Sequence, residues 1–153
     1  MAMEIERKFL VDKNKWKPTV EGEKIAQGYL QYDVNKVVRV RIKGDKGYLT
    51  VKGKTDGISR LEFEYEIPVN DAEEMLVLCG GGVVEKIRYE IPFKGYVWEV
   101  DEFFGENEGL LMAEVEMKNA DEKPQIPDWI TEEVSNDKRY FNSYLSRNPF
   151  KSW

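Results

Sequence analysis

One stretch of the chain decides the fold class: Arg60-Leu61-Glu62-Phe63-Glu64-Tyr65-Glu66-Ile67. Charged and large apolar side chains alternate along it, which is the period of a β-strand, whose successive side chains point to opposite faces of a sheet. The same alternation recurs on both sides of this stretch. The predicted strands are Met3–Val11, Lys24–Gln31, Val37–Lys43, Tyr48–Lys54, Leu61–Val69, Val83–Ile91, Tyr96–Phe103 and Leu111–Lys118.

Short segments rich in turn-forming residues connect most of these strands. Residues 43–47, 53–57 and 92–95 contain glycine together with aspartate or proline, and connections of this length favour antiparallel hairpins. Two helices are expected, at Ala72–Cys79 and at Asn136–Ser146. The predicted fold class is therefore mainly β (α+β). It is an eight-stranded antiparallel closed β-barrel with a few peripheral helices, in a single domain of residues 1–153.

The composition excludes several classes of function. The chain has no histidine and a single cysteine, Cys79, which rules out imidazole-based catalytic triads and cysteine-based zinc clusters. Carboxylates would have to hold any metal, and they favour Mg²⁺ or Mn²⁺. The net charge of −6 argues against binding to duplex nucleic acid. No apolar stretch at the N-terminus is long enough for a signal peptide or membrane span, which predicts a cytoplasmic protein without membrane association.

The charged residues follow the predicted strands in an unusual way. In seven strands they occupy alternate positions, and most of these strands carry one sign of charge. Any single pair could face water, but solvated faces usually mix both signs with neutral polar side chains. We therefore interpret the charged faces as the inner wall of the barrel, where acidic and basic stripes would hold a polyanion together with metal ions. The apolar faces would then need cover from helices, the aromatic C-terminus or a second subunit.

Several charged motifs occur together and in order along the chain. They include Glu4-Ile5-Glu6-Arg7-Lys8, Val38-Arg39-Val40-Arg41, Lys86-Ile87-Arg88, Trp98-Glu99-Val100-Asp101 and Ala113-Glu114-Val115-Glu116. Over about residues 3–145 the chain resembles the CYTH, or triphosphate tunnel metalloenzyme, superfamily, and within it the short bacterial tripolyphosphatase-like branch. The resemblance implies a tunnel through the barrel that binds a small-molecule triphosphate with Mg²⁺ or Mn²⁺ and cleaves a phosphoanhydride bond.

The resemblance also implies roles for individual residues. Glu4 and Glu6 would be metal ligands, joined by Glu116 and by some of Glu114, Glu62, Glu64 and Asp101. The phosphate-binding residues would be Lys8, Arg39, Arg41, Lys52, Arg88 and Arg139. Lys86 would help to activate the attacking water. Tyr29 would orient that water, or alternatively would only pack on a neighbouring strand.

The expected activity is metal-dependent hydrolysis of inorganic tripolyphosphate to pyrophosphate and phosphate. Other activities remain open: a class IV-type adenylate cyclase, a nucleoside or thiamine triphosphatase, or a non-catalytic binder of polyphosphate. The chain lacks the His-Phe pair that typically precedes the first motif in class IV adenylate cyclases. A homodimer is a further possibility, since exposed aromatic side chains such as Trp16 and Trp129 would fit a dimer interface.

Overall fold

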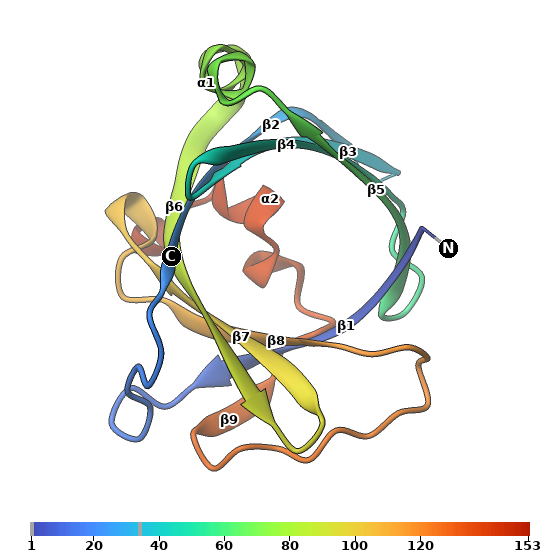
Figure 1. Ribbon diagram of the computed structural model, residues 1–153, viewed down its shortest axis with the longest axis vertical. Helices are drawn as coiled ribbons and strands as arrows, with labels where there is room; N and C mark the ends of the chain where they lie inside the picture. The colour runs from blue at the N-terminus through green and yellow to red at the C-terminus, as the bar shows by residue number, and fades with distance from the viewer. Residues whose placement is uncertain (1, 34) are drawn as a thin grey trace.

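A computed structural model describes residues 2–33 and 35–153. Within this part of the chain there are nine strands, eight of which close into an antiparallel barrel, because β5 pairs with β1 as well as with β4 (Figure 1). The ninth, β9, extends the sheet beyond β1. The strands are β1 (Met3–Val11), β2 (Glu23–Asp33), β3 (Lys36–Lys43), β4 (Lys46–Gly53), β5 (Ser59–Ile67), β6 (Gly80–Phe93), β7 (Tyr96–Phe103), β8 (Leu111–Glu116) and β9 (Ile130–Glu133).

The closed barrel and its eight strands confirm the sequence prediction, although some limits shift. The β6 strand begins at Gly80, three residues before the predicted start, directly after α1 (Val69–Leu78). The α1 helix packs on the outside of β2, β3 and β4 (Figure 1). It also starts earlier than predicted, because the amide of Ala72 donates to the carbonyl of Pro68. The short β9 strand was not predicted, because its four residues, Ile-Thr-Glu-Glu, show no clear alternation of apolar and charged side chains.

The predicted helix at Asn136–Ser146 is wrong. The chain there forms a 3₁₀ turn, η2 (Lys138–Tyr140), and a single helical turn, α2 (Asn142–Leu145), separated by the extended backbone of Phe141. The Asp137 carboxylate caps η2 by accepting from the amide of Arg139. The side chain of Asn142 instead contacts residues of the barrel. Tertiary contacts therefore override the helical spacing of the aromatic residues. Two further 3₁₀ turns are η1 (Gly105–Asn107) and η3 (Phe150–Ser152).

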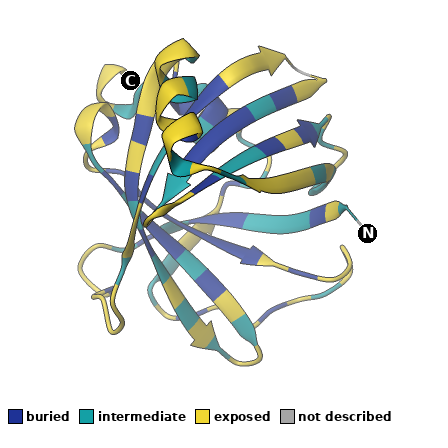
Figure 2. Ribbon diagram, turned by 45° about the horizontal axis from the view of Figure 1, so that its top comes forward, coloured by how far each residue is buried: buried dark blue, intermediate teal, exposed yellow. Residues whose placement is uncertain are grey.

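The main apolar core lies outside the barrel. The side chains of Trp98, Val100 and Val115 are fully buried on the outer faces of β7 and β8. Phe9 and Trp16 complete this outer core, and Trp129 and Ile130 pack against it. In Figure 2, dark blue buried bands alternate with teal and yellow bands along the strands of the barrel. Alternation on these strands therefore sends apolar side chains outward and charged side chains inward, the reverse of an ordinary small barrel.

Trp16 is 7% exposed and packs edge-on against Tyr89, while Trp129 packs edge-on against Trp98. Both tryptophans pack against other side chains of the same chain. The predicted exposure of these two residues, on which the homodimer prediction rested, is therefore wrong. Other apolar side chains stay uncovered in the single chain: Leu61, Phe63 and Tyr65 on the outer face of β5 are between 41% and 62% exposed.

A second apolar cluster fills one part of the barrel interior. Val84, Phe103, Leu110 and Met112 point inward there and pack around Leu145 of α2. All five side chains are at most 4% exposed. This cluster confines the charged cavity to the remaining interior. Among the described residues, no helix has the length and apolar character needed to cross a membrane.

Candidate active site

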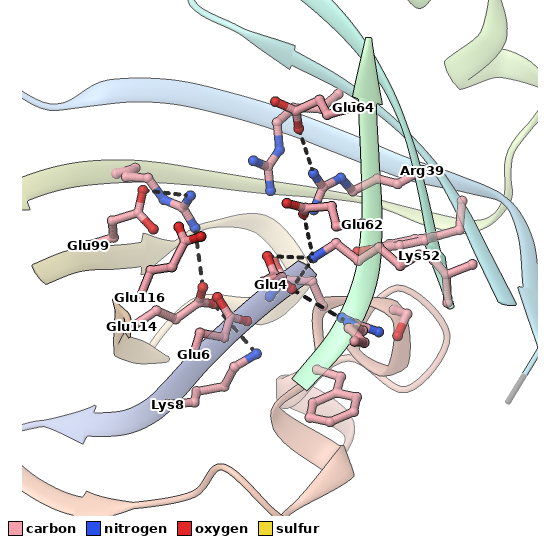
Figure 3. A pocket seen from close by; sticks show the side chains of 18 of the residues that line it. Glu4, Glu6, Lys8, Arg39, Lys52, Glu62, Glu64, Glu99, Glu114 and Glu116 are labelled. Atoms are coloured by element: carbon pink, nitrogen blue, oxygen red, sulfur yellow. Dashed lines mark hydrogen bonds and ion pairs between the residues drawn. The ribbon is translucent and has the colours of Figure 1, made fainter. Parts of the chain in front are cut away.

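The charged side chains converge inside the barrel, as the alternation predicted. Glu4, Glu6 and Lys8 occupy alternate positions on β1 and face inward together (Figure 3). Strand pairing then fixes their neighbours, because Glu6 lies opposite Glu116 and Lys8 lies opposite Glu114 on β8. The cavity between these walls has a volume of about 200 Å³. This is smaller than the roughly 300–1,000 Å³ of pockets for drug-sized ligands, so the cavity suits a small, highly charged ligand.

One wall of the cavity is acidic, and its carboxylates disfavour one another's charge. Burial, and then the charges of Glu114 and Glu4, raise the pKa of Glu6 well above its ordinary value. Burial alone would also raise the pKa of Glu114, but Lys8 and Arg88 hold it well below its usual range. Glu6 is therefore a carboxylate that lacks sufficient positive charge nearby. A cation bound at this wall would supply that charge.

The facing wall is basic and comes mainly from β3 and β4. Burial, and then the charges of Arg39 and Arg88, lower the pKa of Arg41 to about 9. Arg39 donates to the Thr50 hydroxyl and to Glu64, while its Nε has no hydrogen-bond partner among the described residues. These buried cations therefore repel one another and retain unused donors, which is the electrostatic setting that an entering polyanion would stabilise.

Lys52 and Glu4 connect the two walls. Lys52 Nζ lies 3.1 Å from Glu4 Oε1 and 3.2 Å from Glu62 Oε2 (Figure 3). Burial would raise the pKa of Glu4, but the Lys52 ammonium lowers it. Lys52, Glu62 and Glu64 all line the cavity.

Lys86 lies deep in the same cavity, and its side chain is 1% exposed. Its Nζ lies 2.8 Å from Asp101 Oδ2, and Asp101 also accepts two hydrogen bonds from Arg88, each of 2.8 Å. Burial lowers the pKa of Lys86 to about 7; Asp101 opposes this effect, and the charges of Arg88 and Arg41 add to it. A buried lysine with such a pKa can be a neutral amine near neutral pH.

The matched family model is that of the CYTH domain, and it covers residues 2–144. The chain belongs to the CYTH family. Membership implies a divalent metal, and the charged interior described above is the part of the barrel that could hold it. Two curated proteins with the name inorganic triphosphatase are similar to the chain. The one from Acetivibrio thermocellus is 53% identical over 154 residues, covering 100% of this chain and 99% of that protein.

The second relative, from Nitrosomonas europaea, is 36% identical over 152 residues, covering 94% of this chain and 96% of that protein. A solved crystal structure of an inorganic triphosphatase is also similar. It has a TM-score of 0.66 and 35% sequence identity, with 95% of each chain covered. The similarity therefore extends over almost the entire CYTH domain and does not stop at its motifs.

The metal-ligand predictions divide into two groups in this CYTH barrel. Glu4, Glu6, Glu114 and Glu116 line the cavity, together with Glu62 and Glu64. Asp101 does not line the cavity. Its carboxylate instead forms ion pairs with Lys86 and Arg88. In the described part of the chain, no three carboxylates are gathered closely enough to form a complete metal cage. The hard oxygen donors and the raised pKa of Glu6 nevertheless fit a divalent cation by charge and chemistry.

The predicted phosphate-binding residues all reach the interior except Arg139. Its side chain is 55% exposed and pairs with Asp137 at 2.7 Å, outside the cavity. The prediction placed Arg139 in the helix expected at Asn136–Ser146 and among the phosphate-binding residues. Instead, η2 directs it toward Tyr140 and Trp153, and its guanidinium lies over both rings. The structure therefore does not bring Arg139 to the other basic residues.

Sequence analysis missed several residues that the structure places in the site. Arg60 lines the cavity and lies 3.6 Å from Glu4. It shares the inward face of β5 with Glu62, so the alternation could have identified it. Gln27 and Asn142 also join the site. Gln27 shares its strand face with Tyr29, which is a weak signal. Asn142 ends the motif Arg139-Tyr140-Phe141-Asn142, which is also part of the CYTH resemblance, but the resemblance assigned it no role.

Proposed function

We propose that this CYTH protein hydrolyses inorganic tripolyphosphate to pyrophosphate and phosphate with Mg²⁺ or Mn²⁺. One observation carries the proposal: a closed barrel encloses an acidic wall opposite a basic wall, and the cations of the basic wall disfavour one another until an anion is present. The names of the two curated relatives, both inorganic triphosphatases that match almost the full chain, support the same activity.

Glu4, Glu6, Glu114 and Glu116 would hold the metal, with Glu62 and Glu64 as further donors. The bound ion would neutralise charge on the phosphoryl oxygens. Asp101 is left out of this set because its oxygens already form an ion pair with Lys86 and accept hydrogen bonds from Arg88. Its function here is to hold these two cations in place.

Arg39, Arg41 and Lys52 would bind the phosphoryl groups, together with Lys8 and Arg88. Arginine presents two parallel donors to a phosphate, and the Nε of Arg39 has no hydrogen-bond partner in the part of the chain that the structure describes. In the reaction, a water oxygen forms a bond to the terminal phosphorus while the bridging P–O bond breaks. The pyrophosphate leaves with that electron pair. The proton of the water passes to the neutral amine of Lys86, and Tyr29, which also lines the cavity, would orient the water.

The geometry also favours a bare triphosphate over a nucleotide. The cavity lining is almost entirely charged or polar, and a free triphosphate brings more negative charge to it than ATP, whose α-phosphate is esterified. We expect kcat/KM for tripolyphosphate to exceed that for ATP at least about tenfold, which requires about 1.4 kcal/mol of differential transition-state binding. Pyrophosphate, which is too short to contact both walls, should be a poor substrate.

Phosphate release from tripolyphosphate, ATP and pyrophosphate, each with Mg²⁺, with Mn²⁺ and with EDTA, tests the proposal. Faster turnover of tripolyphosphate that stops with EDTA supports it. Equal or faster turnover of ATP, or cyclic AMP among the products, would replace it with a nucleotide-directed activity. Tight binding of tripolyphosphate without any phosphate release would identify a non-catalytic binder instead.

A further inference from the structure

A chain of side-chain amides connects the basic wall to Lys86. Arg41 Nε donates to Gln27 Oε1 at 2.8 Å, and Gln27 Nε2 donates to Asn142 Oδ1 at 3.2 Å. Lys86 Nζ then donates to the same Asn142 oxygen at 2.9 Å. Gln27 is fully buried on β2, and Asn142 begins α2, so residues far apart in sequence meet here.

Arg41 determines which atom donates and which accepts in each hydrogen bond between Arg41 and Lys86. A guanidinium can only donate, so Gln27 must turn its carbonyl oxygen toward Arg41. The amide nitrogen of Gln27 then points to Asn142 and to the hydroxyl of Tyr29, 3.1 Å away. Because Gln27 presents a donor, Asn142 must present its oxygen, and that oxygen is the atom that Lys86 contacts.

Two oxygens lie beside the amine of Lys86: Asn142 Oδ1 accepts its hydrogen bond at 2.9 Å, and Asp101 Oδ2 lies 2.8 Å away as an ion-pair contact. A neutral amine has two N–H bonds and one lone pair. The hydrogen bond to Asn142 Oδ1 fixes one N–H bond and so restricts the lone pair to the other directions around Nζ. Lys86 lines the cavity, so a water beside the substrate can approach the amine from that side.

We propose that Asn142, oriented by Gln27, is a positioning residue that aims the Lys86 lone pair into the cavity. The inference rests on the proposed hydrolysis, in which Lys86 accepts the proton of water. It also connects phosphate binding to proton transfer, because Arg41, a phosphate-binding residue, sets the orientation of the Gln27 and Asn142 amides. A phosphate that moves Arg41 would thereby act on Lys86 through two side chains.

Asn142→Leu and Asn142→Asp test the proposal, because they remove the acceptor or replace it with a charged one. The other charged groups around Lys86 are Asp101 on β7, Arg88 on β6, Arg41 on β3 and Glu114 on β8, and all of them stay in place. We expect Asn142→Leu to lower kcat at least about tenfold, with KM changed less than about threefold, because the Lys86 amine is no longer oriented by Asn142. Asn142→Asp should instead move the acidic limb of the kcat–pH profile upward by about one unit or more, since a second carboxylate favours the ammonium form.

Gln27→Met gives a second measurement with a different signature. It should lower kcat as Asn142→Leu does, and should also raise KM, because Arg41 loses its acceptor. Asn148→Leu is the matched control: Asn148 lies shortly after α2, and its exposed side chain donates to the carbonyl of Tyr144. We expect its kcat to remain at the wild-type value.

The titration of the Lys86 ¹³Cε signal, measured by NMR in the same proteins, keeps the two proposals separable. If the wild type does not hydrolyse tripolyphosphate, the proposed function fails, while an upward shift of the Lys86 pKa in Asn142→Asp still supports the contact. Unchanged kcat and an unchanged Lys86 pKa in both Asn142 variants would overturn the positioning role. So would losses of kcat that simply follow thermal stability while the pH midpoint stays fixed.

Discussion

Glu99 and Asp101 face the barrel interior, whereas Trp98 and Val100 on the same strand are packed in the outer core. The inner pair makes ion pairs with Arg88 and Lys86. The outer pair is fully buried among apolar side chains. The two faces of β7 thus have different roles. The outer face contributes hydrophobic stabilisation, and the inner face places charges in the barrel interior. Changes to the two faces should accordingly affect different measurements.

The largest expected effect comes from the acidic wall. The double change Glu4→Gln and Glu6→Gln keeps the side-chain size but removes two charges that a divalent ion needs. We expect kcat for tripolyphosphate to fall at least about 1,000-fold, while the circular dichroism spectrum and the thermal midpoint stay those of a folded barrel. Full activity in this variant would show that the metal is held elsewhere.

Removal of the buried amine should have the next largest effect. The pKa of Lys86, lowered to about 7, means that the neutral base is lost as pH falls below about 7 and is fully present above about 8. The wild-type kcat should therefore rise with pH through this interval. Lys86→Met should lower kcat at least about 100-fold and abolish that rise. A rise that persists in the variant would assign the proton transfer to another group.

A change in the basic wall should affect binding and turnover together. Arg41→Ala removes a cation whose contact with phosphate strengthens as charge redistributes during transfer. We expect kcat/KM to fall about 100-fold, through both a higher KM and a lower kcat. Steady-state kinetics over a wide range of tripolyphosphate concentrations would separate the two parameters. An effect on KM alone would show that Arg41 binds substrate and transition state equally.

The outer face should behave in the opposite way. Val100→Ala removes two methyl groups from a fully buried site between the inward-facing Glu99 and Asp101. We expect the free energy of unfolding to fall by about 2 kcal/mol, measured by urea denaturation, with kcat of the folded protein within about twofold of wild type. A large loss of kcat would show that packing of the outer core controls the geometry inside.

Arg139 should give the smallest effect. Sequence analysis grouped it with the phosphate-binding residues, but its side chain is exposed and paired with Asp137. We expect Arg139→Ala to change kcat/KM less than about twofold. A loss comparable to that of Arg41→Ala would show that Arg139 leaves Asp137 and reaches the substrate, which would restore the prediction made from sequence.

Much of this barrel could be predicted from the sequence, for a physical reason. Alternation with period two is a local property of each strand, so eight strands and their charged faces were identified before any contact was known. The absence of histidine likewise limited the metal ligands to carboxylates. The motifs carried the CYTH resemblance, which the family match over residues 2–144 confirmed.

Tertiary structure alone decided the rest. Alternation predicted a charged inner wall, but which charged side chains face one another across the cavity depends on closure of β5 on β1. Tertiary packing buried Trp16, which was expected to be exposed, and turned Arg139 away from the cavity. It also brought Asn142 to Gln27, 115 positions earlier in the chain. Contacts at such separations depend on how distant segments pack, and no local pattern of residue types encodes them.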